Sequence, residues 1–398
     1  MADDSLFWYP RIFDFEASKG FMTSFNMGWL TRFRETIFSN ESTQWELSDL
    51  LEALLSRKCS DPRDKIIALY GILKPLLQPS KRTSSQHQEN LEKASFRFPK
   101  LKYSHSVART YKSVTSWALT SRCDAKILYL ACYSSSEAAV RDQLAAHITP
   151  DLPSWAADLQ LLSHLQRPVI SHPFRDPGPG QQIYSACSSA PLTFLRSSAD
   201  MICLKGVHCA TIDYIGSEAQ PLVEDDPTAS KSNRHRHICN TISTWMAECQ
   251  EFYQLHPDFE QSIVKFARGT THFALNEVLQ ETEAELAEYY ESITTIVKRN
   301  EDVSADCEPD VLEAYRLFSA NMANRTLLIS ELRPLGTGFG HFQLGDHIFA
   351  VAGLDNLLIL REAGDDNHVL VGHAFMEGLM QGEAWPEHER CLQDVKIV

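Results

Sequence analysis

The sequence predicts an α+β fold, with a mostly helical body followed by a C-terminal antiparallel β meander or small barrel. Apolar residues recur at helical spacing in several segments between residues 43 and 322, and after Asn324 short apolar runs alternate with glycine and aspartate turns. We divide the chain into helical residues 1–75, a mainly helical body with a few strands at 76–300, and a helix plus β module at 301–398. With 43% hydrophobic residues, the chain has enough apolar side chains for a sizeable core.

Two helices are predicted before residue 75. The capping box Thr43-Gln44-Trp45-Glu46 begins the first, and leucines follow it at i, i+3, i+4 and i+7. The second begins in DPRDKIIALYGIL, residues 61–73, where Asp61 can cap the helix, Pro62 suits its first turn and Asp64 takes the third position. Capping of the helix explains the charged residues at its start. The functional alternative is that a carboxylate and the arginine form a pair in a pocket.

Shorter patterns predict the middle of the chain. Val107, Tyr111 and Val114 share one face of a helix at about 104–121. The apolar run 126–132 fits either a buried strand or a helix, because periodicity does not separate the two over so short a run. Residues 201–216 alternate like a strand or a bent pair of strands, residues 217–236 are loop-like, and a helix follows at about 238–255.

The most regular segment is 273–299. Its apolar residues follow steps of four and three along one helix face, and glutamates occupy the other face. We favour packing of this stripe onto the chain's own core, because a coiled coil between chains needs about three heptads or more and Thr282 interrupts the seam. A homodimer through the 275–296 helix is the alternative.

Four strands are predicted near the C-terminus, in RTLLISE, HIFAVAG, NLLILRE and HVLVGHAFME. Short turns such as Gly364-Asp365-Asp366-Asn367 separate them and indicate antiparallel neighbours. The glycine-rich segment Gly336–His341 has neither the Lys-Ser/Thr of a phosphate loop nor the strand-to-helix context of a dinucleotide site. We interpret it as a tight connection into the β module rather than as an anion cradle.

The net charge of −15 opposes binding to nucleic acid and to anionic lipid. The N-terminus carries Asp3 and Asp4 where a signal peptide needs positive charge, and no apolar run long enough for a membrane span follows. We therefore expect a cytoplasmic protein whose partner is a protein or a small-molecule ligand, without nucleic acid or membrane. The ten cysteines include no Cys-x-x-Cys pair, so reduced and mostly buried thiols are expected.

No motif identifies a nucleophile, a metal site or a cofactor site, so we expect neither cofactor nor metal. His373, Glu377, Glu383 and His388 are close in sequence, but the strand-like pattern around His373 separates its side chain from that of Glu377 by about 13 Å. If the chain is an enzyme, we expect cofactor-free proton transfer in an apolar pocket. The candidate residues are Asp61, Arg63, Asp64, His341, Asp346 and Glu383.

Three segments resemble fungal heterokaryon-incompatibility (HET) proteins. DPRDKIIALYGIL resembles the segment that closes the HET domain, and LPSWAADL at 152–159 resembles a stretch found downstream of that domain. NRTLLISELRPLGTGFGHFQLGDHIFAVAGLDNLLILRE and VLVGHAFMEGLMQGEA resemble the C-terminal region of the same proteins. The blocks follow the family's order between about residues 45 and 385.

The sequence also departs from the family pattern. Only about sixty residues precede DPRDK, and they lack the TIR-like strand pattern with which the HET domain begins. Leu159 stands where the family has the second tryptophan of LPSWxxDW, and Phe375 stands in place of a tyrosine. The resemblance therefore implies a truncated member without its own death effector.

Two classes of function remain open. The resemblance implies a fungal protein that acts in self/non-self recognition, scaffolding or ligand sensing. The alternative is a cofactor-independent small-molecule enzyme of fungal secondary metabolism, of the cyclase, isomerase or lyase type. A closed cavity into which Arg63 or its carboxylate neighbours point would favour the enzyme, and solid packing around them would favour recognition.

Overall fold

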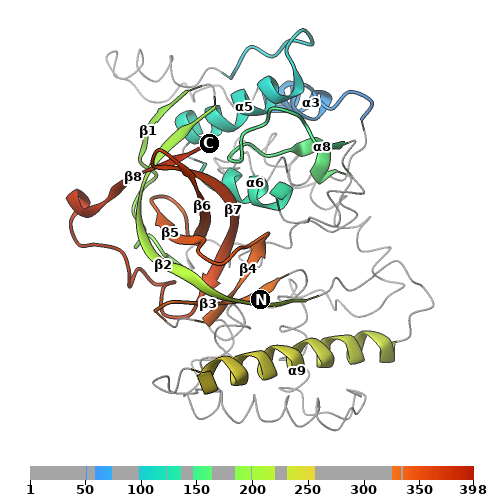
Figure 1. Cartoon of the computed structure of the whole chain (residues 1–398). Coiled ribbons are helices and arrows are strands. Elements are labelled where there is room, and N and C mark those ends of the chain that lie inside the picture. The colour runs from blue at the N-terminus through green and yellow to red at the C-terminus, as the bar shows by residue number, and fades with distance from the viewer. Residues whose placement is uncertain are drawn as a thin grey trace, which may run out of the picture.

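The computed structural model describes residues 51, 59–73, 98–122, 124–135, 147–163, 184–198, 200–219, 231–255, 325–332 and 335–398. A mostly antiparallel sheet of eight strands dominates them (Figure 1). The strands are β1 (Phe194–Ser197), β2 (Ile202–Glu218), β3 (Thr326–Ser330), β4 (Leu335–Gly340), β5 (His347–Val351), β6 (Leu357–Gly364), β7 (Asn367–Met376) and β8 (Gln393–Ile397). The helices are α3 (Asp64–Leu73), α5 (Val107–Trp117), α6 (Ile127–Ser135), α8 (Leu159–Leu162) and α9 (Lys231–Leu255).

The prediction of a mostly helical body with a C-terminal β module is therefore wrong for the described residues. The four predicted C-terminal strands are present as β3, β5, β6 and β7, but β2 joins the same sheet from the middle of the chain, and β4 and β8 are strands that the patterns missed. The ambiguous run 126–132 is helical. The predicted helix at 273–299 and the homodimer contact at 275–296 lie outside the described residues.

Strand β2 closes the sheet on itself. It pairs with β5 along one edge and with β3 along the other, so the order β2, β3, β4, β7, β6, β5 returns to β2 (Figure 1). The pairing register shifts between His208 and Ala210 and again between Ile212 and Tyr214. Such bulges bend a strand, which allows its 17 residues to curve around the others. We call these six strands the strand ring; β1 and β8 flank the start of β2.

Strand β4 replaces the tight connection predicted at Gly336–His341. Its glycines occupy alternate positions, 336, 338 and 340, so one face of the strand has no side chains. A Cβ atom on Gly338 would lie 2.6 Å from Cζ of Phe342, whose ring packs against this bare face. The glycines thus serve close packing, and this explains why a segment of low β propensity forms a strand.

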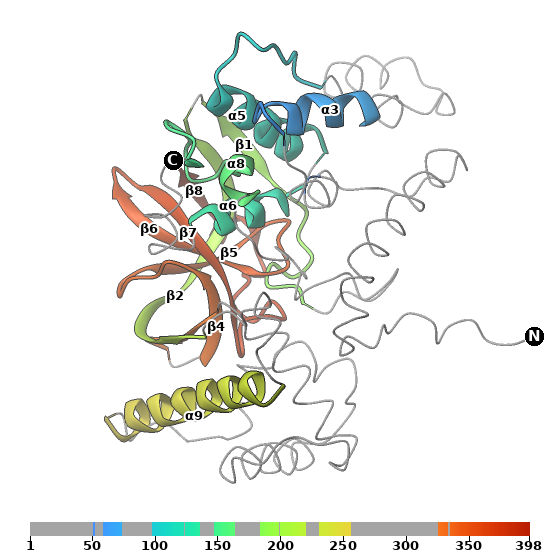
Figure 2. The ribbon, with the colours of Figure 1, turned by 90° about the vertical axis from the view of Figure 1, so that its right-hand side faces the viewer.

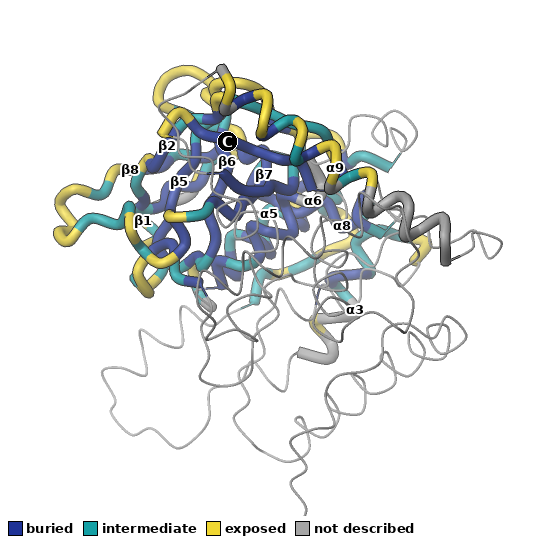
Figure 3. Tube along the Cα trace, turned by 90° about the horizontal axis from the view of Figure 1, so that it is seen from below, coloured by how far each residue is buried: buried dark blue, intermediate teal, exposed yellow. Residues whose placement is uncertain are grey.

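Strands β3, β4 and β5, the first half of β6 and the second half of β7 are buried on both faces, whereas the turn between β6 and β7 is exposed (Figure 3). One apolar cluster joins the helices to the strands, with Tyr111 of α5 and Leu128 of α6 packed among Leu204, Leu358 and Leu370. A second cluster gathers the other side chains of the strands around residues such as Phe342, Ile348 and Ile359. Burial of both faces removes the polar-apolar alternation from the C-terminal strands.

Helix α9 packs at the far end of β2, on the opposite side of the sheet from α3 and α5 (Figures 1 and 2). The indole nitrogen of the fully buried Trp245 donates to the carbonyl oxygen of Ser217 at 2.8 Å. The carboxylate of Glu248 accepts the backbone N–H of the same serine at 3.0 Å. None of the helices that the structure describes combines the length and apolar character needed to cross a bilayer.

The contact between β4 and β7 predicts a large effect of Gly336→Ala. The added Cβ atom would overlap the backbone oxygen of Phe375 on the neighbouring strand, which cannot move without breaking the strand pairing. We expect a loss of about 3 kcal/mol in the free energy of unfolding, measured by urea denaturation of the full chain. Gly345→Asn is the control, because a Cβ there meets nothing within 4 Å and asparagine tolerates the φ of +88°. Equal stability of the two variants would contradict this packing.

Candidate functional site

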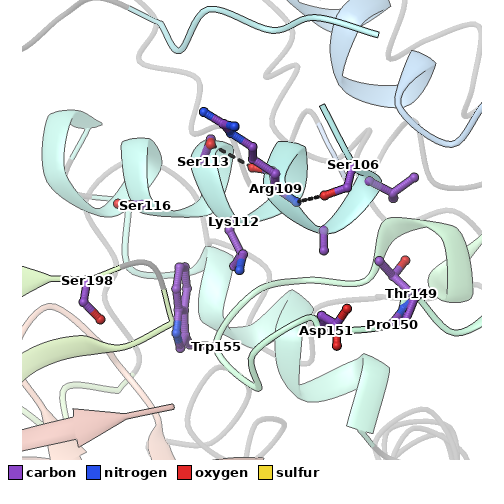
Figure 4. Close-up of a pocket in the computed structure, with 12 residues that line it drawn as sticks. Ser106, Arg109, Lys112, Ser113, Ser116, Thr149, Pro150, Asp151, Trp155 and Ser198 are labelled. Atoms are coloured by element: carbon purple, nitrogen blue, oxygen red, sulfur yellow. Dashed lines mark hydrogen bonds between the residues drawn. The ribbon is translucent and has the colours of Figure 1, made fainter. Parts of the chain in front are cut away.

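A groove with a volume of about 640 Å³ lies between helix α5 and the segment 149–155 (Figure 4). Most of the residues that line it carry charged or hydroxyl groups, but carbon atoms contribute more of its exposed surface than nitrogen and oxygen atoms do. The lining residues are Ser106, Val107, Ala108, Arg109, Lys112, Ser113, Ser116, Thr149, Pro150, Asp151, Trp155 and Ser198.

Helix α5 presents its polar side to the groove because its apolar side is used by the core. Ser106 begins the helix, and its Oγ accepts the backbone N–H of Arg109 at 3.1 Å. Tyr111, Val114 and Trp117 are buried beneath the helix. The polar residues 109, 112, 113 and 116 follow at i, i+3, i+4 and i+7, and therefore form one stripe along the groove.

A buried carboxylate holds the opposite wall. Asp158 is 4% exposed, accepts the backbone N–H of Thr149 at 2.7 Å and its hydroxyl at 2.9 Å, and also caps the short helix α8. Trp155 is 1% exposed, and its indole nitrogen donates to the carbonyl oxygen of Asp200 at 3.3 Å. These bonds fix Thr149 and Trp155, so the wall is set before any ligand arrives.

Lys112 supplies a positive charge to the groove. Its side chain points from α5 toward Trp155 and Asp151, whereas the side chain of Arg109 points away from them (Figure 4). The Lys112 ammonium pairs with the carboxylate of Asp200 at 2.6 Å, and the Asp200 side chain is 74% exposed. The hydroxyls of Ser106 and Ser113 are hydrogen-bonded to the backbone of α5, so no neighbouring side-chain base activates either of them in these contacts.

The DPRDK residues form a local brace outside the groove. Arg63 binds Asp61 through two hydrogen bonds, of 2.8 and 2.6 Å, and donates to the carbonyl oxygens of Tyr103 and His105. Hydrogen bonds from Arg63 lower the pKa of Asp61. Tyr103 donates to Asp64, and the Tyr111 hydroxyl donates to the carbonyl oxygen of Pro62 at 2.9 Å. These contacts fix the segment from which α5 begins.

The other predicted site residues form a second cluster and an isolated turn. Asp346, 2% exposed, accepts Nε and Nη2 of Arg361 at 2.7 and 2.9 Å and the backbone N–H of Gln343 at 2.7 Å. Arg361 also donates to the carbonyl oxygen of His341. The structure thus places Asp346 and His341 around one arginine. Glu383 accepts a local hydrogen bond from the backbone N–H of Gln381 at 2.7 Å.

None of the six candidate residues lines the groove. Asp61 binds Arg63, Asp64 accepts from the Tyr103 hydroxyl, and Asp346 accepts from Arg361. Sequence reasoning missed the groove residues Ser106, Arg109, Lys112 and Asp151. The polar stripe opposite the apolar face of the predicted helix at 104–121 was the signal that could have found the α5 half. Its other half depends on contacts between distant segments, which no local pattern encodes.

Comparison of this chain with protein-family models, with curated proteins and with solved structures finds no match. Within the described part of the chain, no group of three or more histidine, cysteine, aspartate or glutamate side chains is arranged to hold a metal ion. The groove is therefore interpreted from its own chemistry alone.

The buried carboxylate of Asp158 gives a prediction for the groove wall. Asp158→Ala removes the bonds to Thr149 and the cap of α8, and should lower the free energy of unfolding by about 2–4 kcal/mol in urea denaturation. Asp151→Asn should be nearly neutral, because residue 151 is exposed and asparagine tolerates its φ of 57°. An Asp158→Ala variant as stable as Asp151→Asn would show that the wall does not depend on this carboxylate.

Proposed function

We propose that this chain is a recognition and ligand-sensing protein, and that the groove along α5 binds a small polar molecule with a carboxylate or phosphate group. The observation that carries the proposal is the Lys112 ammonium, which points into a preformed groove lined by hydroxyl and charged side chains over a largely apolar surface, and which has an exposed carboxylate, Asp200, as its ion-pair partner. Cavities of a few hundred Å³ are typical of small-molecule sites.

An anionic ligand can replace Asp200 at low cost. Ion pairs with one largely exposed partner contribute about 1 kcal/mol or less, and the Asp200 carboxylate regains water when it leaves. The Lys112 side chain is 21% exposed, so its ammonium is already partly desolvated. A ligand anion at this place would gain a charge-assisted hydrogen bond, while hydroxyl groups on the ligand could reach Ser198, Thr149 or Asp151.

The enzyme alternative has less support. Proton transfer needs an acid or base whose polar atoms face a substrate site. Asp61, Arg63 and Asp64 instead brace the segment before α5, and both carboxylate oxygens of Asp346 already accept strong hydrogen bonds. A recognition role does not require these residues to face a substrate site.

The relation to HET proteins is part of the proposal, as is a cytoplasmic location in a fungal cell. Supporting it, the three resembling segments belong to one folded unit. Ser154 of LPSW donates to the carbonyl oxygen of Val398 and accepts the backbone N–H of Leu370 at 2.9 Å, and Pro62 of DPRDK is held by Tyr111 of α5. The segments that resemble HET proteins therefore hold the folded unit together. This suits a scaffold that related proteins share and that binds a different ligand in each of them.

The test is a thermal-shift and calorimetric screen of the full chain against small anions, with inorganic phosphate, citrate, malate and a nucleoside monophosphate as probes. We expect at least one probe to bind, and Lys112→Met to raise its Kd by about 10- to 100-fold, the worth of a charged hydrogen bond. Lys205→Met is the matched control, because Lys205 also pairs with an aspartate at 2.6 Å but does not line the groove.

Two results would contradict the proposal. One is an equal loss of affinity in the Lys112→Met and Lys205→Met variants, which would indicate a nonspecific charge effect. The other is the absence of binding by every probe when Lys112 is intact and the chain is folded.

A further inference from the structure

Three histidines from three strands meet on the strand ring, and none of them lines the groove. His208 lies on β2, His347 on β5 and His368 on β7. The ring centroids of His208 and His347 are 5.0 Å apart, and those of His347 and His368 are 6.3 Å apart. The ring of Phe349 lies 5.5 Å from His208 and 5.3 Å from His368, so one apolar ring contacts both outer histidines.

The contact between His208 and His347 requires a neutral ring. Nε2 of His208 and Nδ1 of His347 are 3.1 Å apart, which is a hydrogen-bonding distance. One nitrogen must donate and the other must accept. A doubly protonated pair has N–H groups on both sides of this contact and no acceptor, so full protonation breaks the bond and adds charge repulsion between β2 and β5.

Charged groups from every neighbouring strand act on these rings. Oε1 of Glu362 on β6 lies 3.2 Å from Nε2 of His347 and accepts a hydrogen bond when that nitrogen carries the proton. Glu331 lies near His208, directly after β3. His368 is near Glu362 and Asp366 and hydrogen-bonds the backbone of Lys396 on β8. Lys396 in turn lies 4.0 Å from Asp366. At His208 and His368, burial and the neighbouring histidines oppose protonation, whereas the carboxylates favour it.

We propose that His208, His347 and His368 form a pH-sensitive contact that joins β2, β5 and β7 while the rings are neutral and loosens the strand ring when they are protonated. The proposal is independent of the groove and of its ligand.

The pKa values of His208 and His368 determine whether stability rises or falls as the pH drops. Burial, with the charge of His347, lowers the pKa of His208 below its ordinary value of 6.5, and burial likewise lowers the pKa of His368. Well above pH 6.5 both rings are neutral in the folded and the unfolded chain, so their protonation does not affect stability. As the pH falls through 6.5, the unfolded chain takes up protons first, so stability falls until the pH reaches the lower pKa values of the folded chain, below which the loss levels off.

The experiment is urea denaturation of the full chain at several pH values between 7.5 and 5.5. The wild-type folding constant should fall with pH, and the H208Q/H368Q variant should lose about tenfold less over this range, the equivalent of about one pKa unit. H388Q is the control: His388 is exposed and outside the cluster, so its variant should keep the wild-type slope.

A second measurement covers the case in which the double variant does not fold. Imidazole signals of the wild-type chain, assigned with the single variants H208Q and H368Q, should show that His208 and His368 titrate below pH 6.5. A double variant with the wild-type pH slope would overturn the proposal. So would titration of both rings at or above pH 6.5 in the folded chain.

Discussion

The fold depends on one strand that pairs along both of its edges. Without β2, strands β3 to β7 form an open sheet, and the hydrogen bonds of β5 and β3 to β2 convert it into a ring. The same strand carries the features around which the molecule is organised. Asp200 precedes it at the groove, His208 lies at its centre, and Ser217 at its end receives α9. A change in the path of β2 therefore affects the groove, the histidine contact and the packing of α9.

Residues of the DPRDK and LPSW stretches hold the two walls of the groove in place. Arg63 binds the carbonyl oxygen of His105, one residue before the cap of α5, and so fixes where that helix begins. Ser154 ties the Trp155 wall to the backbones of Leu370 and Val398. The charged side chains at the start of DPRDK therefore brace the wall of the groove from outside.

The sequence predicted elements whose signals are local. The apolar stripe of α5 and the apolar runs of β5 and β6 depend on neighbouring residues only, and these elements are present. Strand β4 was missed because its glycines are needed for close packing against Phe342 and against the backbone of β7, and these contacts arise only after folding. Sequence reasoning identified charged residues that lie outside the groove, such as Asp346 and Arg63, and missed Lys112. The role of Lys112 depends on Asp200 and Trp155, which come from other parts of the chain.

Hydrogen-deuterium exchange of the full chain, with and without the anion that binds most tightly, tests the central claim most directly. If the groove is the binding site, the ligand should slow backbone exchange in two separate segments, the start of α5 and residues 149–155, with little change around Asp346 and Arg361. Protection concentrated at Asp346 and Arg361, or spread evenly over the chain, would contradict the assignment of the groove.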